Sequence, residues 1–166
     1  YSVYDTDSEA KRLMESSLEV VQKLSECFGR DIYHNGRLNR GLLSSRVFGK
    51  SDKIVLLNSI VHPVVRFDFY RWSESLNEEI CFVESAILYE SRFDELVDEV
   101  WTVTAPEELR ISRVRQRSGL TEEEIKKRMA AQLSEEEKQR RAAHIIWNDG
   151  NVSVIHRVLS LLKSLE

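Results

Sequence analysis

The chain has 166 residues, of which 42% are hydrophobic and 31% charged, and this length and apolar content fit one ordinary globular domain. The formal net charge of −4 at pH 7 argues against a general nucleic-acid binder, because phosphate contacts require a basic surface. The sequence has no apolar run of about 18 residues, so we expect no membrane-spanning segment. Cys27 and Cys81 lie in apolar surroundings, which predicts buried thiols and a cytoplasmic location.

The first half of the chain predicts one short strand followed by helices. A β-prone run at residues 3–4 precedes apolar residues that recur at helical spacing until Gly29, which stops the helix. Asn35 and Gly36 then mark a turn. Two or three short helices are expected through residue 76, and Pro63 is expected to begin one of them.

The second half predicts further strands that alternate with helices. Continuous apolar runs predict buried strands at residues 79–88 and 100–104, and a third short strand is expected at 144–147. Pro106 opens a helix that Gly119 stops, and Thr121 with Glu124 makes a capping box for the next helix. This alternation indicates an α/β fold with a parallel sheet and right-handed crossovers.

Asp5 and Asp7 are the first polar residues with possible chemistry. They follow the predicted strand at residues 3–4, and open α/β sheets bind their ligands at the carboxyl ends of strands. A carboxylate at this place can accept a hydroxyl proton or organise Mg²⁺. The alternative interpretation is structural, with Asp7 as the N-cap of the helix that follows.

Three arginines form a second candidate site. Arg113 and Arg117 share one face of a predicted helix, and Arg128 lies on the next helix, beyond a turn. Guanidinium groups bind phosphate oxygens through paired hydrogen bonds and can stabilise the charge on a transferring phosphoryl group. The alternative is a solvated face on which these arginines pair with neighbouring glutamates.

His62 and Arg66 flank the predicted helix start at Pro63. Either side chain could contact a substrate phosphate, and His62 could equally be a structural hydrogen-bonding group. The other histidines have no ligand-like spacing, so we predict no zinc-type metal site.

One segment imitates a phosphate-binding loop. Residues 48–51 match the end of the pattern G-x-x-x-x-G-K-[ST], but Ser44 occupies the position of the first glycine. A loop of this type needs a preceding strand, so that its backbone N–H groups can surround a phosphate. The residues before 48–51 predict a helix, and we interpret the segment as a turn between helices.

Several segments together resemble the dephospho-CoA kinase family, in order and spacing, over nearly the whole chain. VYDTDSEAKRL is similar to V-x-D-A-D-x-x-A-R, GRLNRGLL with the following VF to G-x-L-[DN]-R-x-x-L…VF, and LNSIVHPVVR to LN-x-x-x-HP-x-[VI]-R. AILYE resembles P-L-L-F-E, and SGLTEEEIKKRMAAQLSEEEK with the following HIIWNDG resembles the lid and nucleotide-base segments. This sequence departs from the family at Ser85 and Ala86, which replace a proline-containing approach, and at Glu84, which adds a carboxylate.

The resemblance implies a single P-loop-kinase-like domain over residues 1–166, related to nucleoside monophosphate kinases. We expect three layers around a parallel sheet, with a helical substrate subdomain and a helical lid. The implied core spans residues 1–10, 77–110 and 142–166, the substrate subdomain spans 11–76, and the lid spans 111–141.

The resemblance also assigns roles to single residues. Asp7 falls on the family's catalytic base, and Arg113, Arg117 and Arg128 fall in or beside the lid as the catalytic arginines. Asn148 lies where the adenine of ATP is held. The candidate contacts to dephospho-CoA are Asp5, Arg40, His62, Arg66 and Glu90.

The implied reaction is phosphorylation of the ribose 3′-hydroxyl of dephospho-CoA by ATP with Mg²⁺, which gives coenzyme A. The family carries a first strand and a G-x-x-G-S-G-K-[ST]-like loop before the V-x-D-A-D segment, and here only Tyr1 and Ser2 precede that segment. We therefore expect the strand and loop to be absent from this chain and its activity to be impaired. Dephospho-CoA and ATP are the expected partners, without nucleic acid or membrane, and the oligomeric state is left open. The alternatives are another small nucleoside or nucleotide kinase, or a non-catalytic ligand-binding fragment.

Overall fold

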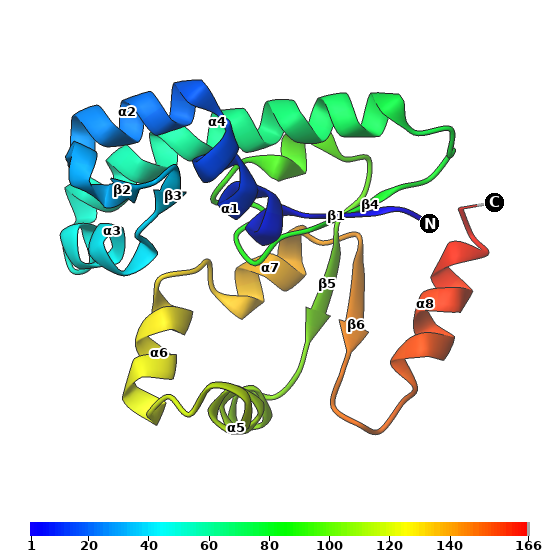
Figure 1. Cartoon of the computed structure of the whole chain (residues 1–166). Helices are drawn as coiled ribbons and strands as arrows, with labels where there is room; N and C mark the ends of the chain where they lie inside the picture. Colours follow the sequence, from blue (N-terminus) through cyan, green and yellow to red (C-terminus); the bar gives the residue numbers. More distant parts are fainter. Residues whose placement is uncertain (166) are drawn as a thin grey trace. The chain divides into compact units, whose positions relative to one another are not determined.

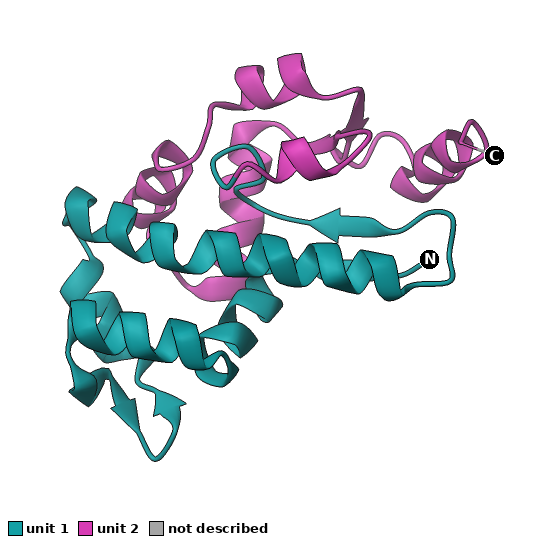
Figure 2. Cartoon of the chain, turned by 90° about the horizontal axis from the view of Figure 1, so that it is seen from above, with its two compact units in different colours: residues 1–91 teal, residues 92–166 magenta. Residues whose placement is uncertain are grey.

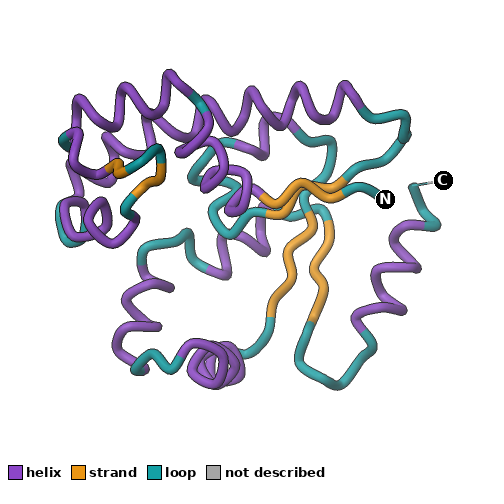
Figure 3. The backbone as a smooth tube through the Cα atoms, viewed as in Figure 1, coloured by secondary structure: helices purple, strands orange, loops and turns teal. Residues whose placement is uncertain are grey.

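The computed structural model describes residues 1–165 and divides into two compact units. The first unit is Tyr1–Ser91 and the second begins at Arg92 (Figure 2). Each unit contains one parallel pair of strands with helices around it, and the two pairs are drawn in orange in Figure 3. The α/β fold with parallel strands is therefore confirmed.

The first unit pairs β1 (Val3–Asp5) with β4 (Phe82–Glu84), in a register that sets Asp5 opposite Glu84. The chain between these strands is mostly helical (Figure 1). Its elements are α1 (Thr6–Ser16), α2 (Leu18–Phe28), η1 (Arg30–Ile32), β2 (Tyr33–His34), β3 (Arg37–Leu38), α3 (Arg40–Val47) and α4 (Ser51–Ser75).

Aromatic packing joins β1 to α4 in this unit. The Tyr4 ring lies with its centroid 5.3 Å from that of Phe69 and 5.3 Å from that of Trp72. Tyr4 is only 3% exposed, and Leu24 and Ile32 are fully buried. Burial of such side chains is the main favourable term in folding, so β1 and the helices behind it form one core.

Three predictions for this unit are wrong. The helix expected to run to Gly29 is two helices, because Ser17 ends α1 and caps α2 through its side chain. Pro63 lies inside the continuous helix α4, whose neighbouring residues Val61 and Val65 are buried. Cys27 is exposed and Cys81 is only half-buried, so the apolar neighbours in the sequence do not bury these thiols.

The second unit pairs β5 (Trp101–Thr104) with β6 (His144–Trp147). Its helices are η2 (Phe93–Leu96), α5 (Glu107–Ser118), α6 (Glu122–Ala130), α7 (Glu135–Arg141) and α8 (Val154–Leu162). Gly119 ends α5 with a φ of 68°, and the capping box of Thr121 and Glu124 is present. Both of these sequence signals are confirmed.

Within residues 1–165, none of the helices combines the length and the apolar character needed to cross a membrane.

Candidate active site

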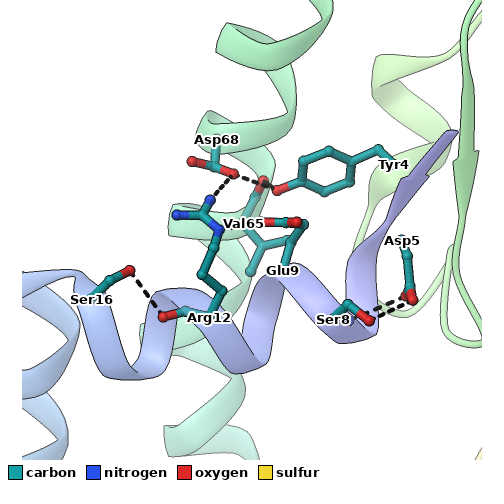
Figure 4. Close-up of polar contacts among 8 residues, drawn as sticks. All are labelled: Tyr4, Asp5, Ser8, Glu9, Arg12, Ser16, Val65 and Asp68. Atoms are coloured by element: carbon teal, nitrogen blue, oxygen red, sulfur yellow. Dashed lines mark hydrogen bonds and ion pairs between the residues drawn. The ribbon is translucent and has the colours of Figure 1, made fainter. Parts of the chain in front are cut away.

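The junction of β1 and α1 is built around Asp5, which caps the helix. One Asp5 carboxylate oxygen accepts the backbone N–H groups of Asp7 and Ser8 at 3.0 and 3.2 Å, and the other accepts the Ser8 hydroxyl at 2.6 Å (Figure 4). The hydrogen bonds from Ser8 hold the pKa of Asp5 below its usual value. The structural interpretation of Asp7 as the N-cap is therefore wrong, because the cap is Asp5.

The Asp7 carboxylate consequently accepts none of the hydrogen bonds that cap α1. Its backbone N–H donates to Asp5, and its side chain is exposed in the first turn of α1. No hydrogen bond or ion pair to this carboxylate is described within residues 1–165. A carboxylate with these properties, just beyond the carboxyl end of β1, is available to accept a proton from a bound hydroxyl group.

Thr6 ties this junction to the neighbouring strand. Its hydroxyl donates to the Glu84 carbonyl oxygen at 2.9 Å, and the residue is 7% exposed. The carboxylates of Asp5 and Glu84 thus end two adjacent parallel strands, because these residues are register partners. These polar groups lie at the carboxyl ends of the two strands, which is where proteins of this fold class bind their ligands.

An ion-pair network behind the junction fixes α1 against α4 (Figure 4). The Tyr4 hydroxyl donates to Asp68 at 2.8 Å, and Arg12 pairs with Asp68 at 2.7 Å and also with Glu9. Burial, strengthened by the hydrogen bond to Asp68, raises the pKa of the Tyr4 hydroxyl, so it stays protonated and keeps donating. This network lines a pocket of about 490 Å³. The pocket walls are Tyr4, Glu9, Arg12, Asp68, Arg71, Trp72 and Ser75.

The residues predicted to bind the acceptor lie along the helical part of the first unit. His62 and Arg66 sit one turn apart within α4, and both are half-buried. Burial lowers the pKa of His62, and the nearby Arg66 charge adds to the effect, so the imidazole is neutral at pH 7. Arg40 begins α3 and pairs with Glu15 at 3.2 Å. Glu90 lies in the turn that follows β4 and is exposed.

In the second unit, the structure brings together two predicted residues. Nη1 of Arg113 donates to the carbonyl oxygen of Asn148 at 2.7 Å, and the Asn148 N–H donates to the Thr104 carbonyl at 2.7 Å. Hydrogen bonds from Asn151 lower the pKa of the next residue, Asp149, and the Arg113 charge lowers it further. The backbone of Asn148 is therefore held from both sides, and contact of this residue with the adenine of ATP stays a prediction.

The other two arginines are exposed near the ends of their helices. Arg117 lies in the last turn of α5 and Arg128 in the last turn of α6. Hydrogen bonds from Thr121 hold the pKa of Glu124 low, and the Arg128 charge contributes. Both alternatives, phosphate contact and a solvated charged face, are compatible with this exposure. Convergence of these arginines on one phosphate stays a prediction.

Within the part of the chain that the structure describes, no group of three or more His, Cys, Asp or Glu side chains could hold a metal ion. The carboxylates at the sheet edge, Asp5, Asp7 and Glu84, are oxygen ligands of the type that Mg²⁺ prefers.

Sequence reasoning missed the residues that support this site. Thr6, Arg12 and Asp68 make contacts across 56 or more positions in the sequence, and local spacing gives no signal for such pairs. Only the position of Thr6, two residues after the buried strand residue Tyr4 on the same face, could have indicated a structural hydrogen bond.

Comparison with known proteins places this geometry in a family. A family model described as dephospho-CoA kinase matches residues 1–153. The dephospho-CoA kinase of Porphyromonas gingivalis is 35% identical over 98% of this chain and 81% of that protein. The enzymes of Bacteroides fragilis and Salinibacter ruber are 36% and 38% identical, over 98% and 93% of this chain and 80% of each relative.

Solved structures agree with the sequence comparison. A crystal structure from Thermus thermophilus has a TM-score of 0.83 and 32% identity, covering 99% of this chain and 84% of that one. A dephospho-CoA kinase from Campylobacter jejuni, at 23% identity, shares the fold with a TM-score of 0.70 over 100% of this chain and 87% of that one. From the match over residues 1–153 and the identity spread over nearly its whole length, the chain belongs to the dephospho-CoA kinase family.

Proposed function

We propose that the protein transfers the γ-phosphoryl group of ATP to the ribose 3′-hydroxyl of dephospho-CoA, giving coenzyme A in the cytoplasm. Membership of the family makes the chain a kinase that uses ATP and acts in coenzyme A biosynthesis. Mg²⁺ enters with ATP as the charge-neutralising ion of phosphoryl transfer. One observation carries the proposal: Asp5 caps α1, so the Asp7 carboxylate remains available to accept a proton.

Asp7 is the proposed catalytic base. In-line phosphoryl transfer passes through a loose transition state, so positioning and charge stabilisation supply most of the rate enhancement. The Asp7 carboxylate accepts the proton of the attacking 3′-hydroxyl, while the bonds that Asp5 and Thr6 make keep the start of α1 in place. Glu84, at the end of β4, is a further oxygen group for the hydrated Mg²⁺.

The arginines are proposed to bind the nucleotide phosphates. Arg117 and Arg128 are exposed and carry guanidinium groups suited to phosphate oxygens. Arg113 lies on α5 and donates a hydrogen bond to the Asn148 carbonyl. We propose that Asn148 contacts the adenine of ATP.

The acceptor is proposed to bind on the helical part of the first unit. Arg40 and Arg66 supply positive charge for the phosphates of dephospho-CoA. His62 is neutral at pH 7 because burial lowers its pKa, so its contribution is a hydrogen bond rather than an ion pair. Asp5 and Glu90 are the acidic groups proposed to approach the acceptor ribose.

The phosphate-binding loop is the component that these 166 residues do not supply. The sequence contains no complete G-x-x-x-x-G-K-[ST] pattern. Gly49, Lys50 and Ser51 match its last three positions, but Ser44 occupies the position of its first glycine. The structure is consistent with this, since Gly49 lies between α3 and α4 and so directly follows a helix instead of a strand. We propose that residues 1–166 alone bind dephospho-CoA, bind ATP weakly and turn over slowly.

Calorimetric titration and a coupled ADP-release assay test the proposal. The 166-residue chain is expected to bind dephospho-CoA more tightly than ATP. A form extended before Tyr1 by a strand and phosphate-binding loop is expected to bind ATP and to phosphorylate dephospho-CoA in preference to nucleosides and nucleotides. Preference of the extended form for a nucleoside or nucleotide would support the alternative small kinase. Binding without any turnover in the extended form would support a non-catalytic ligand-binding role.

A further inference from the structure

A cluster of partly buried charges joins α7 to the carboxyl end of β5. The Glu135 carboxylate lies 3.1 Å from Nη1 of Arg110 and 3.5 Å from Nζ of Lys138. Its other oxygen accepts a hydrogen bond from the Thr104 hydroxyl at 3.0 Å. The side chains of Arg110, Glu135 and Lys138 retain only 26%, 22% and 16% of their exposure. Loss of Glu135 would leave two poorly hydrated cations side by side, so the cluster resists opening.

Hydrogen bonds to uncharged acceptors extend the same attachment. Nε of Arg110 donates to the Ala105 carbonyl at 3.0 Å, which ties the first turn of α5 to the end of β5. Gln139 donates to the Thr104 hydroxyl at 3.3 Å, and Thr104 is 3% exposed. Nζ of Lys138 also donates to Gln132 at 2.9 Å. The start of α5 and the residues Glu135 and Gln139 of α7 are therefore bound to the end of β5, and Gln132, just before α7, is bound to Lys138.

Helix α6 is held in a different way. Its one buried side chain within the described residues is Ile125, at 2% exposure. Its capping box and its Lys126–Glu122 ion pair both lie within the helix itself. The helix begins three residues beyond Gly119, whose φ is 68°. It contacts α5, whereas α7 contacts β5 (Figure 1).

We propose that Glu135 is a positioning residue that fixes α7 to the sheet, so that the arm moving over the nucleotide is residues 118–131 rather than the whole of 111–141. The inference rests on the proposed function for the purpose of the motion, but the attachment is a property of the chain without substrate. Arg128 moves with the arm. Arg113 stays with the fixed part, because it is bonded to the Asn148 carbonyl.

Hydrogen–deuterium exchange of the ligand-free 166-residue protein tests this division without any need for catalysis. The amides of α7 are expected to exchange at least about ten-fold more slowly than those of α6, because local opening of α7 must break the charge cluster. Glu135→Ala is expected to remove that difference by accelerating α7 alone. Glu136→Ala is the matched control, because Glu136 is an exposed acidic residue on the same turn, and it should change neither helix.

A second pair of variants separates the ion pairs from the hydrogen bond and guards against misfolding of the first variant. Glu135→Gln keeps an acceptor for Thr104 but loses both ion pairs, so an intermediate acceleration of α7 is expected. Thr104→Val removes only the hydroxyl partner of Glu135 and Gln139, and a smaller acceleration is expected. Equal exchange of α6 and α7 in the unchanged protein, or an unaltered α7 in all three Glu135 and Thr104 variants, would overturn the inference. Neither outcome depends on which substrate the enzyme phosphorylates.

Discussion

Removal of one buried hydroxyl group tests how the β1–α1 junction is supported. Tyr4→Phe keeps the ring that packs on Phe69 and Trp72. It deletes the hydroxyl, which donates to Asp68 at 2.8 Å and makes a longer contact with the Val65 carbonyl at 3.4 Å. Asp68 retains Arg12 as a partner at 2.7 Å. The variant therefore removes the hydroxyl contacts between β1 and α4 while the apolar packing is conserved.

The magnitude follows from the nature of the acceptor. A hydrogen bond to a charged group contributes about 1.5 to 3 kcal/mol, and the lower end applies because Asp68 is 29% exposed and water can replace the lost donor. We therefore expect the free energy of unfolding to fall by about 1.5 kcal/mol. For a chain of this length, that loss lowers the Tm by about 3 to 6 °C.

Urea denaturation followed by circular dichroism measures the loss, with Tyr70→Phe as the matched control. Tyr70 lies on α4, the helix that contains Asp68, and is 54% exposed, so its hydroxyl should contribute little to stability.

The pH dependence of stability provides a second test of the Tyr4 hydroxyl. The pKa of Tyr4 lies above its usual value of 10.0 because the residue is buried, so its stabilisation is complete below pH 10 and is lost as the pH rises further. Tyr4→Phe should flatten that alkaline loss. Stabilities of the two variants that agree within about 0.3 kcal/mol would refute the reasoning, since surface changes have effects of that size.

Three further predictions concern single residues. Asp5→Ala is expected to lower the urea midpoint more than Asp7→Ala, because only Asp5 caps α1; the reverse order would contradict the assignment of the cap. The pKa of His62 is depressed in the fold, so stability should fall as the pH drops below the usual value of 6.5, and His62→Gln should weaken that dependence in acid unfolding curves. Gly29→Ala is expected to cost more than about 1 kcal/mol in the same assay, since φ is 94° and a Cβ would lie 2.6 Å from Arg46. Gly36→Ala, with a φ of 75° and open space around it, should cost less, and equal losses would show that the contact with Arg46 is unimportant.

Local signals predicted the parts of the fold that local chemistry decides. Gly119 ends α5 because glycine tolerates a positive φ, and Thr121 with Glu124 starts α6 because each side chain bonds the other's backbone N–H. The third strand of the second half, at residues 144–147, was predicted with its observed bounds. These elements depend on neighbours within a few residues, which a sequence displays directly.

Features that depend on distant partners were not predicted. Pro63 was expected to start a helix, yet burial of Val61 and Val65 on either side carries α4 through it. Asp5 and Asp7 both suit an N-cap, and the choice is made by pairing of Asp5 with Glu84 in the strand. A shift of the cap by two residues decides whether Asp5 or Asp7 has a carboxylate available for chemistry. The residue types alone do not determine the position of the cap.

The sequence resemblance located the candidate site, while the structure determines what each group can do there. His62 and Arg66 were expected near a helix start and instead lie in mid-helix, where burial makes the imidazole neutral. Arg113 was expected at the phosphates, which stays a prediction, and the structure shows it bonded to the Asn148 carbonyl. This bond joins segments that lie far apart in the sequence.

The most direct test of the central claim is the turnover of Asp7→Asn in the extended form that carries the phosphate-binding loop. A general base contributes about 10² to 10⁴ in rate, so kcat for dephospho-CoA phosphorylation should fall at least about 100-fold, with urea unfolding and dephospho-CoA binding unchanged. Asp5→Asn, which keeps a capping oxygen, should lose less turnover than Asp7→Asn, because Asp5 is not the proposed base. Near-normal turnover of Asp7→Asn in a folded protein would contradict the account, because the carboxylate left available by the helix start would then have no part in the chemistry.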